Sequence, residues 1–459
     1  MPLHVARGRP LEGLFPTDVG PSWPRPSAAL AMVAMGVAFV APVMRQVGAS
    51  ALETIWAEDG RVFLQSALLQ GPVEAVSSLY AGYLHLVPRL VAEVAALLPL
   101  GQVSEAITLA ANGVAALCAL AVFVATRPFL RSSGVRALLA VSLVLVPTAG
   151  VEVLNNVANV QWYLLVASFW LLLWRPPSIL GAVGASVLLV ATALSAPLSV
   201  LLVPLALGRL VVTPRGRSAV PAWLFGIAVV LQLMAASSSL SQPGSFGGAP
   251  GTMLLAYAQR VAAAAFLGQR IGGTLWARIG WPLPLVATVV LAAMLILGLT
   301  VGARQTRGLL FVTAAYSLGF FLATTFLRGN AEGLLWPQNA SHANGGRYTV
   351  VPLLLIYGMV AAFLEGLRLR GRQGLLRSVQ VMVLVVAAVA VLGDFRLRNG
   401  RSGGPLWEEA LEGARPACPT HLDRTVPVAI TPPGWTVDVP CHELEAGMSR
   451  AGPSGGSRR

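Results

Sequence analysis

Lysine is absent from this chain of 459 residues, and charged side chains of any kind make up only 11% of it. A soluble globular protein carries about 25% charged residues. This shortage of charge, beside 56% hydrophobic residues, excludes a soluble globular fold. It predicts an all-α integral membrane protein whose helices satisfy their own backbone hydrogen bonds in lipid. All 32 basic residues are arginine, which fits a GC-rich genome.

Further absences limit the chemistry. The chain has no Walker loop and no nucleophile elbow, and its five histidines are too scattered for a zinc motif. No cofactor is assigned, although a divalent cation such as Mg²⁺ or Mn²⁺ held by carboxylates stays open. The net charge of +13 has no soluble basic domain to carry it, so nucleic acid is not expected as a partner.

Long apolar runs dominate what is present. A membrane span needs roughly 20 mostly apolar residues. The runs predict eleven spans, several of them short, at 28–44, 104–126, 137–151, 161–174, 179–194, 197–211, 219–237, 282–302, 308–326, 348–367 and 378–393.

Two more apolar segments, 84–99 and 253–270, are interpreted as helices that lie on or dip into the outer face. The distribution of arginine carries this interpretation, because cytoplasmic loops hold the excess of positive charge. With the N-terminus inside, the cytoplasmic segments hold sixteen arginines and three acidic residues, and the outer segments hold sixteen of each. If 84–99 crossed the bilayer, the arginines from Arg127 to Arg136 would face outward.

The chain therefore divides into a retained cytoplasmic tail (1–27), a transmembrane domain (28–393) whose first outer loop is 45–103, and an extracytoplasmic tail (394–459) with a disordered end. Cys118 lies within a span and is expected to act as a small apolar residue. Cys418 and Cys441 lie in the tail, where an oxidising compartment would let them pair. The alternation from Trp435 to Val439 indicates a small strand-rich cap.

Glu58 and Asp59 are the most informative residues. Two adjacent carboxylates follow the first apolar segment of a chain with few acids, and a charge close to hydrocarbon is costly unless it is used. They are our candidates for catalysis. The structural alternative is that Asp59 caps a surface helix while Glu58 pairs with Arg61.

The same loop continues with Tyr83, His85 and Arg89. Tyr83 and His85 can hydrogen-bond a sugar or buffer a proton, and the guanidinium of Arg89 suits a phosphate because its fork donates two hydrogen bonds. Interfacial anchoring by tyrosine and arginine is the structural alternative.

A second polar cluster falls at the outer junction of two predicted spans. Side-chain amides match sugar hydroxyls, and an indole offers a stacking face. Hydrogen bonding between helices explains such amides equally well. The cluster consists of Glu152, Asn155, Asn156, Asn159, Gln161 and Trp162.

A third cluster runs from Arg328 to Tyr348. Gly345 and Gly346 allow close approach of the backbone, which places Arg347 at the outer mouth of a span beside Tyr348. The rest of the cluster is Glu332, Trp336, Gln338, Asn339, His342 and Asn344, where Asn339 also begins a short N-glycosylation pattern.

Together these residues resemble the GT-C superfamily of polytopic membrane glycosyltransferases. The resemblance lies in the span layout from about 28 to 393 and in the acidic pair Glu58-Asp59 of the first outer loop. It implies a hexosyl- or pentosyltransferase of the bacterial plasma membrane. A polyprenyl-phosphate sugar would be the donor, and an envelope glycan, lipid or protein the acceptor. The cysteine-containing tail is not a general feature of that superfamily.

The implied mechanism is a single inverting displacement, with Asp59 or Glu58 as the base and Arg89 and Arg347 at the leaving phosphate. Two other classes stay open. A transporter or flippase of lipid-linked saccharides would use the same arginines along a path through the bilayer. A non-catalytic scaffold of envelope assembly would tolerate replacement of Glu58 and Asp59.

Overall fold

The computed structural model describes residues 13–16, 25–237, 247–329, 331–336, 345–418 and 424–450. Within these ranges the chain is mostly helical. Several of its helices are long and apolar, so the protein is an all-α, multi-pass membrane protein. The predicted fold class is confirmed at this level.

Eight helices in the described ranges are long and apolar enough to cross a bilayer. Some of them are extended by a turn of 3₁₀ helix, namely η3 (Leu100–Gln102), η4 (Pro147–Gly150) and η8 (Gly346–Thr349). The eight are α1 (Arg25–Arg45), α5 (Val103–Ala125), α6 (Ser133–Leu145), α10 (Val220–Ser237), α13 (Pro282–Thr300), α14 (Arg304–Arg328), α15 (Val350–Leu369) and α16 (Gln373–Asp394).

Three shorter apolar helices match the remaining predicted spans. They are α7 (Val160–Leu173), α8 (Ile179–Ala193), and α9 (Val203–Val212) with the preceding turn η5 (Pro197–Leu202). With 14 residues, α7 is about 21 Å long, shorter than the hydrocarbon layer of about 30 Å. Its side chains are buried nearly all round, so it is a core helix of the bundle. The count of eleven spans therefore stays a prediction.

The two apolar segments set apart from the spans are helical but broken. Residues 84–99 contain α4 (Leu86–Ala96), whose 11 residues are too few to cross a membrane. Residues 253–270 fall in α11 (Pro250–Tyr257), the π-helix η6 (Ala258–Ala263) and α12 (Ala264–Ile279). Gly268 interrupts α12 with a left-handed φ of 71°. Neither segment is among the eight long helices.

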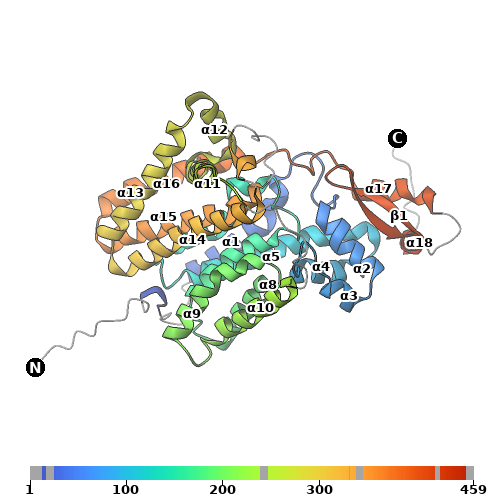
Figure 1. Cartoon of the computed structure of the whole chain (residues 1–459), viewed down its shortest axis with the longest axis horizontal. Helices are drawn as coiled ribbons and strands as arrows, with labels where there is room; N and C mark the ends of the chain where they lie inside the picture. The colour runs from blue at the N-terminus through green and yellow to red at the C-terminus, as the bar shows by residue number, and fades with distance from the viewer. Residues whose placement is uncertain are drawn as a thin grey trace, which may run out of the picture.

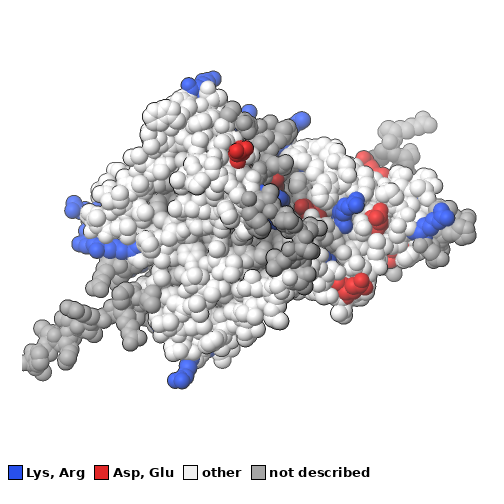
Figure 2. All heavy atoms as spheres, in the orientation of Figure 1, with Lys and Arg blue, Asp and Glu red and all other residues white. Residues whose placement is uncertain are grey.

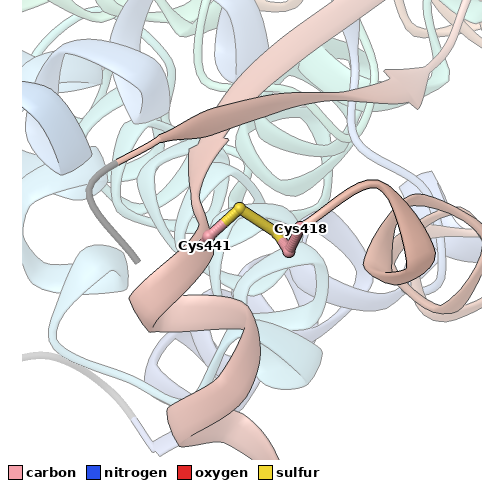
Figure 3. Close-up of a disulfide and its surroundings, with 2 residues drawn as sticks. All are labelled: Cys418 and Cys441. Atoms are coloured by element: carbon pink, nitrogen blue, oxygen red, sulfur yellow. A yellow bond between two sulfur atoms is a disulfide. The ribbon is translucent and has the colours of Figure 1, made fainter. Parts of the chain in front are cut away.

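The tail after α16 forms a cap, which we define as residues 395–450. It contains α17 (Trp407–Ala414), the turn η9 (Arg415–Ala417), the strands β1 (Thr425–Ile430) and β2 (Trp435–Pro440), and α18 (Cys441–Arg450). The two strands pair in antiparallel fashion. Cys418 and Cys441, the pair that the sequence suggested, are joined by a disulfide that ties the end of η9 to the start of α18 (Figure 3).

The cap packs against the first loop. That loop holds the π-helix η2 (Asp59–Leu64), α2 (Gln65–Leu69) and α3 (Pro72–Ser77). The backbone N–H of Ala57 donates to the carbonyl of Thr431 at 2.5 Å, and the N–H of Thr431 donates to the carbonyl of Ile55 at 3.0 Å. The Thr431 hydroxyl donates to the same Ile55 carbonyl at 2.7 Å. These bonds fix the chain immediately before Glu58 and Asp59.

Figure 1 shows α2, α3, α4, α17 and the strands together at one end of the helix body. We call this end, which carries residues 46–102 and 395–450, the cap end. On the face shown in Figure 2, acidic and basic side chains appear together at the cap end. The opposite end of the helix body shows arginine without acids, and a largely uncharged surface separates the two ends. Which of these ends faces the cytoplasm stays a prediction.

Gly60 sits where η2 meets the hairpin, and it tests this packing. A Cβ atom there would lie 2.6 Å from Cδ1 of Ile430, 2.7 Å from Cγ2 of Val437 and 2.9 Å from Cγ2 of Ile55, and all three side chains are buried. We expect Gly60→Ala to lower the stability of the purified protein by about 1–3 kcal/mol, because an overpacked interface must shift. Thermal unfolding in detergent measures this.

Gly71→Ala is the matched control, since a Cβ at Gly71 meets nothing within 4 Å. Equal unfolding temperatures for the two variants would contradict the tight packing of η2 against the cap.

Candidate functional site

The adjacent carboxylates Glu58 and Asp59 have different surroundings. The side chain of Asp59 is only 1% exposed. Its Oδ1 accepts the backbone N–H of Ala158 at 2.8 Å, and its Oδ2 accepts the N–H of Val157 at 3.0 Å. Asp59 therefore holds the loop before α7. It does not cap a surface helix, which corrects the structural alternative for this residue, while its role as a catalytic base stays a prediction.

Glu58 is half-buried, and the structure gives its carboxylate no hydrogen-bond partner within the described ranges. Arg61 donates to the hydroxyl of Thr436 at 3.3 Å rather than to Glu58. Glu58 interacts electrostatically with Tyr80 and with Arg347. Of the two carboxylates, Glu58 is thus the more accessible one.

The burial of Asp59 has an electrostatic consequence. Desolvation raises the pKa of Asp59 from 3.8 to about 7, while the N–H of Ala158, the charge of Arg401 and the N–H of Val157 oppose the rise.

Arg401 comes from the cap, and the sequence did not predict its role. Its guanidinium donates to the carbonyl of Thr54 at 2.7 Å and to the carbonyl of Asn155 at 3.0 Å. No feature of the sequence sets this arginine apart from its neighbours.

The predicted amide cluster is used within the protein. Asn155 donates to the carbonyl of Pro42 at 2.8 Å. The Asn156 and Asn159 amides donate to the carbonyl of Glu152 at 2.8 and 3.0 Å. The Trp162 indole then donates to the Asn159 amide oxygen at 3.1 Å. All four of these side chains are buried and make hydrogen bonds within the protein, and their contact with a sugar stays a prediction.

Arg347 and Tyr348 lie where the third cluster approaches this loop. The Glu152 carboxylate accepts the N–H of Gly345 at 3.2 Å and the N–H of Arg347 at 3.3 Å. It therefore fixes the backbone turn before α15, in which Gly345 has a left-handed φ of 92°. The guanidinium of Arg347 lies over the ring of Tyr348 and interacts electrostatically with Glu152 and Glu58.

The tyrosines of the first loop face the same arginines. Tyr80 and Tyr83 both interact electrostatically with Arg347 and with Arg328 at the end of α14. Burial raises the pKa of both hydroxyl groups, so they remain neutral donors. The hydroxyl of Tyr83 also bonds the side chain of Gln161.

His85 and Arg89 lie deeper than predicted. The His85 ring is 3% exposed and stacks on Tyr83, with ring centroids 4.0 Å apart. Burial lowers its pKa to about 3, so this imidazole stays neutral and does not buffer protons near neutral pH. Arg89 donates to the carbonyl of Ala75 at 2.6 Å and covers the ring of Phe63. Arg89 interacts electrostatically with Glu93 and with His85, which Arg328 also reaches. The place of Arg89 at the donor phosphate stays a prediction.

We define the cap-end site by five residues that the structure brings together from four segments. Glu58 precedes η2, Tyr80 and Tyr83 precede α4, Arg328 ends α14, and Arg347 precedes α15. Arg328 begins the third polar cluster of the sequence, but only the fold shows that it interacts with Tyr80. Gln338, Asn339, His342 and Asn344 lie outside the described residues.

The site's neighbourhood does not offer an evident metal centre. Within the described ranges, no three or more His, Cys, Asp or Glu side chains group so that they could hold a metal ion. A role for Mg²⁺ or Mn²⁺ stays a prediction. One open cleft of about 400 Å³ lies elsewhere, and it contains no carboxylate. It is lined by Arg270, Ile271, Thr274, Leu275, Leu392 and Gly393.

In comparison with known proteins, no family model and no curated protein matches the chain.

The different roles of the two carboxylates can be measured as stability. Asp59→Ala leaves two buried N–H groups without acceptors, and each costs about 1–3 kcal/mol. We expect a loss of about 2 kcal/mol or more in thermal unfolding of the purified protein. Glu58→Ala, the adjacent control, should stay within about 0.5 kcal/mol of the native chain. A larger loss for Glu58→Ala would reverse the assignment of roles.

The raised pKa of Asp59 also predicts a pH dependence. A carboxyl whose pKa is raised on folding contributes stability that is complete below its unfolded pKa. That contribution is lost as the pH rises from 3.8 through about 7. The unfolding temperature of the native chain should therefore fall across this interval more than that of Asp59→Asn, which cannot ionise. Parallel pH profiles for the two proteins would contradict the buried carboxyl as the cause.

Proposed function

We propose that this protein is an integral membrane glycosyltransferase that moves a sugar from a polyprenyl-phosphate donor to an acceptor hydroxyl at the cap end. The observation that carries the proposal is that Glu58, whose carboxylate has no hydrogen bond within the described ranges, interacts electrostatically with Arg347. Glu58 lies within electrostatic reach of Arg347, and Arg328 lies within reach of the tyrosines beside them. A base and a phosphate-binding cation are the two groups that such a transfer requires.

In the proposed reaction, Glu58 accepts the proton of the acceptor hydroxyl. The hydroxyl oxygen bonds to the anomeric carbon while the bond from that carbon to the donor phosphate breaks, which inverts the configuration. Polyprenyl phosphate leaves as an anion, and the guanidinium groups of Arg347 and Arg328 stabilise its charge. The proton then passes from Glu58 to water. No nucleophile from the protein is needed, because a single displacement has no covalent intermediate.

The surroundings of Arg328 suit a lipid donor. Phe326 and Leu327, which immediately precede it on α14, are exposed at 49% and 44%. An isoprenoid chain can lie against such a surface while its phosphate reaches the arginine at the helix end. Tyr80 and Tyr83, which stay neutral, are suited to hydrogen-bond sugar hydroxyls.

The proposal extends to location. We infer that the protein lies in a bacterial plasma membrane with its N-terminus in the cytoplasm and its cap outside. Two observations support this orientation. Arginine without acids marks one end of the helix body in Figure 2, and cytoplasmic segments carry such an excess. The disulfide of the cap suits an oxidising compartment. The acceptor would then be a glycan, lipid or protein of the cell envelope.

Transfer from a panel of labelled polyprenyl-phosphate sugars by the purified protein tests the proposal. We expect Glu58→Gln to reduce transfer about 100-fold or more, because a general base typically contributes that much. Glu74→Gln, which changes an exposed acid of the same loop, should leave transfer unchanged.

Full transfer by Glu58→Gln would remove Glu58 as the base. No transfer from any donor by the folded native protein would instead favour the transporter or flippase of lipid-linked saccharides, which would use Arg328 and Arg347 along its substrate path.

A further inference from the structure

Arg260, in η6, differs from the other buried arginines of the described chain. The guanidinium groups of Arg45, Arg209 and Arg401 each donate to several backbone carbonyls. Arg260 is equally buried, at 2% exposure. Its Nε is shielded from solvent without any acceptor, as is that of Arg89, but Arg89 donates through Nη1. Within the described ranges the guanidinium of Arg260 donates no hydrogen bond. Burying a polar group without a partner is costly, so this position calls for an acceptor.

The side-chain amides of Gln259 and Gln269 also have buried donors without acceptors. The backbone N–H of Trp336 donates to Oε1 of Gln259 at 2.8 Å, and the Trp336 indole donates to Oε1 of Gln269 at 3.3 Å. These bonds fix both amide orientations, because only the oxygen of an amide can accept from an N–H group. The two Nε2 groups therefore point elsewhere, and both are buried without an acceptor.

The backbone around these residues departs from regular α-helix at two places. Gln259 and Arg260 lie in a π-helix, a form that often occurs at functional sites. Gln269 follows the left-handed break at Gly268. Figure 1 shows α12 beside α16, and the Asp394 carboxylate at the end of α16 accepts the N–H groups of Gln269 and Arg270.

The two acids nearest Arg260 do not supply the acceptor that it lacks. Glu152 and Asp394 interact with Arg260 electrostatically, but neither accepts a hydrogen bond from it. Their oxygens receive backbone N–H groups instead, from Gly345 and Arg347 and from the break in α12. Gln259, Arg260 and Gln269 thus each have a buried donor without an acceptor. They share neighbours, because both glutamines accept a hydrogen bond from Trp336, and Asp394 interacts with Arg260 and accepts the N–H of Gln269.

We propose that Gln259, Arg260 and Gln269 form a phosphate-binding site, filled by free phosphate or by the phosphate of a lipid headgroup. A phosphate offers several acceptor oxygens, and bonds to a guanidinium are stronger when both partners are charged. Glu152 lies between this site and the cap-end site, because it interacts with both Arg260 and Arg347. The site does not depend on glycosyl transfer.

Binding can be measured without an activity assay. The unfolding temperature of the full-length protein in a neutral detergent is titrated with inorganic phosphate, with phosphatidic acid, and with diacylglycerol, which lacks only the phosphate. We expect the phosphate-bearing probe to raise the unfolding temperature and diacylglycerol to have no effect. Arg260→Gln should bind about tenfold more weakly or worse, because it loses a charge-assisted pair. Arg278→Gln, an exposed arginine of the same α12, should bind normally.

Gln259→Glu gives a second, subtler variant. It keeps the oxygen that faces the Trp336 N–H and replaces only the donor NH₂ by an oxygen, which repels an anion. If Arg260→Gln does not fold, Gln259→Glu and Gln269→Glu test the proposal in its place. We expect both to weaken binding.

The probes also identify the source. Stabilisation by inorganic phosphate assigns the site to free phosphate, and stabilisation by phosphatidic acid alone assigns it to a lipid headgroup. Two results overturn the proposal. One is no stabilisation of the native protein by any phosphate, which leaves internal water as the acceptor. The other is undiminished stabilisation of Arg260→Gln and Gln259→Glu, which places phosphate elsewhere.

Discussion

Backbone N–H groups that are buried outside regular helices are the constraint on which the rest of this structure depends. In an apolar environment no water is available to hydrogen-bond such groups, so atoms of the protein must do so. Three carboxylates solve this problem, each binding two N–H groups of a distant turn. Asp59 holds the loop before α7, Glu152 holds the turn before α15, and Asp394 holds the break in α12. One of these turns carries Arg347, so the position of this residue of the cap-end site depends on the carboxylate of Glu152.

The adjacent acidic residues Glu58 and Asp59 have different surroundings and therefore different roles. The cap fixes the chain at Ala57 through Thr431, and η2 begins two residues later. Asp59 consequently points into the bundle while Glu58 stays at its edge. Both residues are carboxylic acids and they are adjacent, so the sequence alone does not show which of them is buried. Their difference arises from the partner that each side chain meets, and for Asp59 that partner lies 98 residues further along the chain.

The sequence predicted what depends on local composition. Each of the eleven apolar segments contains an apolar helix, because a long hydrophobic run is visible without knowing its neighbours. The roles of Asn156, Asn159 and Arg401 depend instead on contacts between segments far apart. An amide that binds a sugar and an amide that binds a carbonyl look alike in a sequence. The histidine of the first loop gives the same lesson, since only burial reveals that its ring stays neutral.

The hydrogen bonds of the buried basic side chains give the absence of lysine a physical explanation. Buried helix ends leave carbonyl groups unpaired, and a guanidinium has five donors in a planar fork where an ammonium has three on one atom. Arg209 uses its fork to reach the carbonyls of Leu171, Leu172 and Ser218. Arg45 joins the ends of α1, α6 and α16 in the same way. Arginine is thus the counterpart of the three carboxylates, satisfying acceptors where they satisfy donors. Arg260 departs from this pattern, since it finds no carbonyl among the described residues, and that departure is the reason we propose a binding role for it.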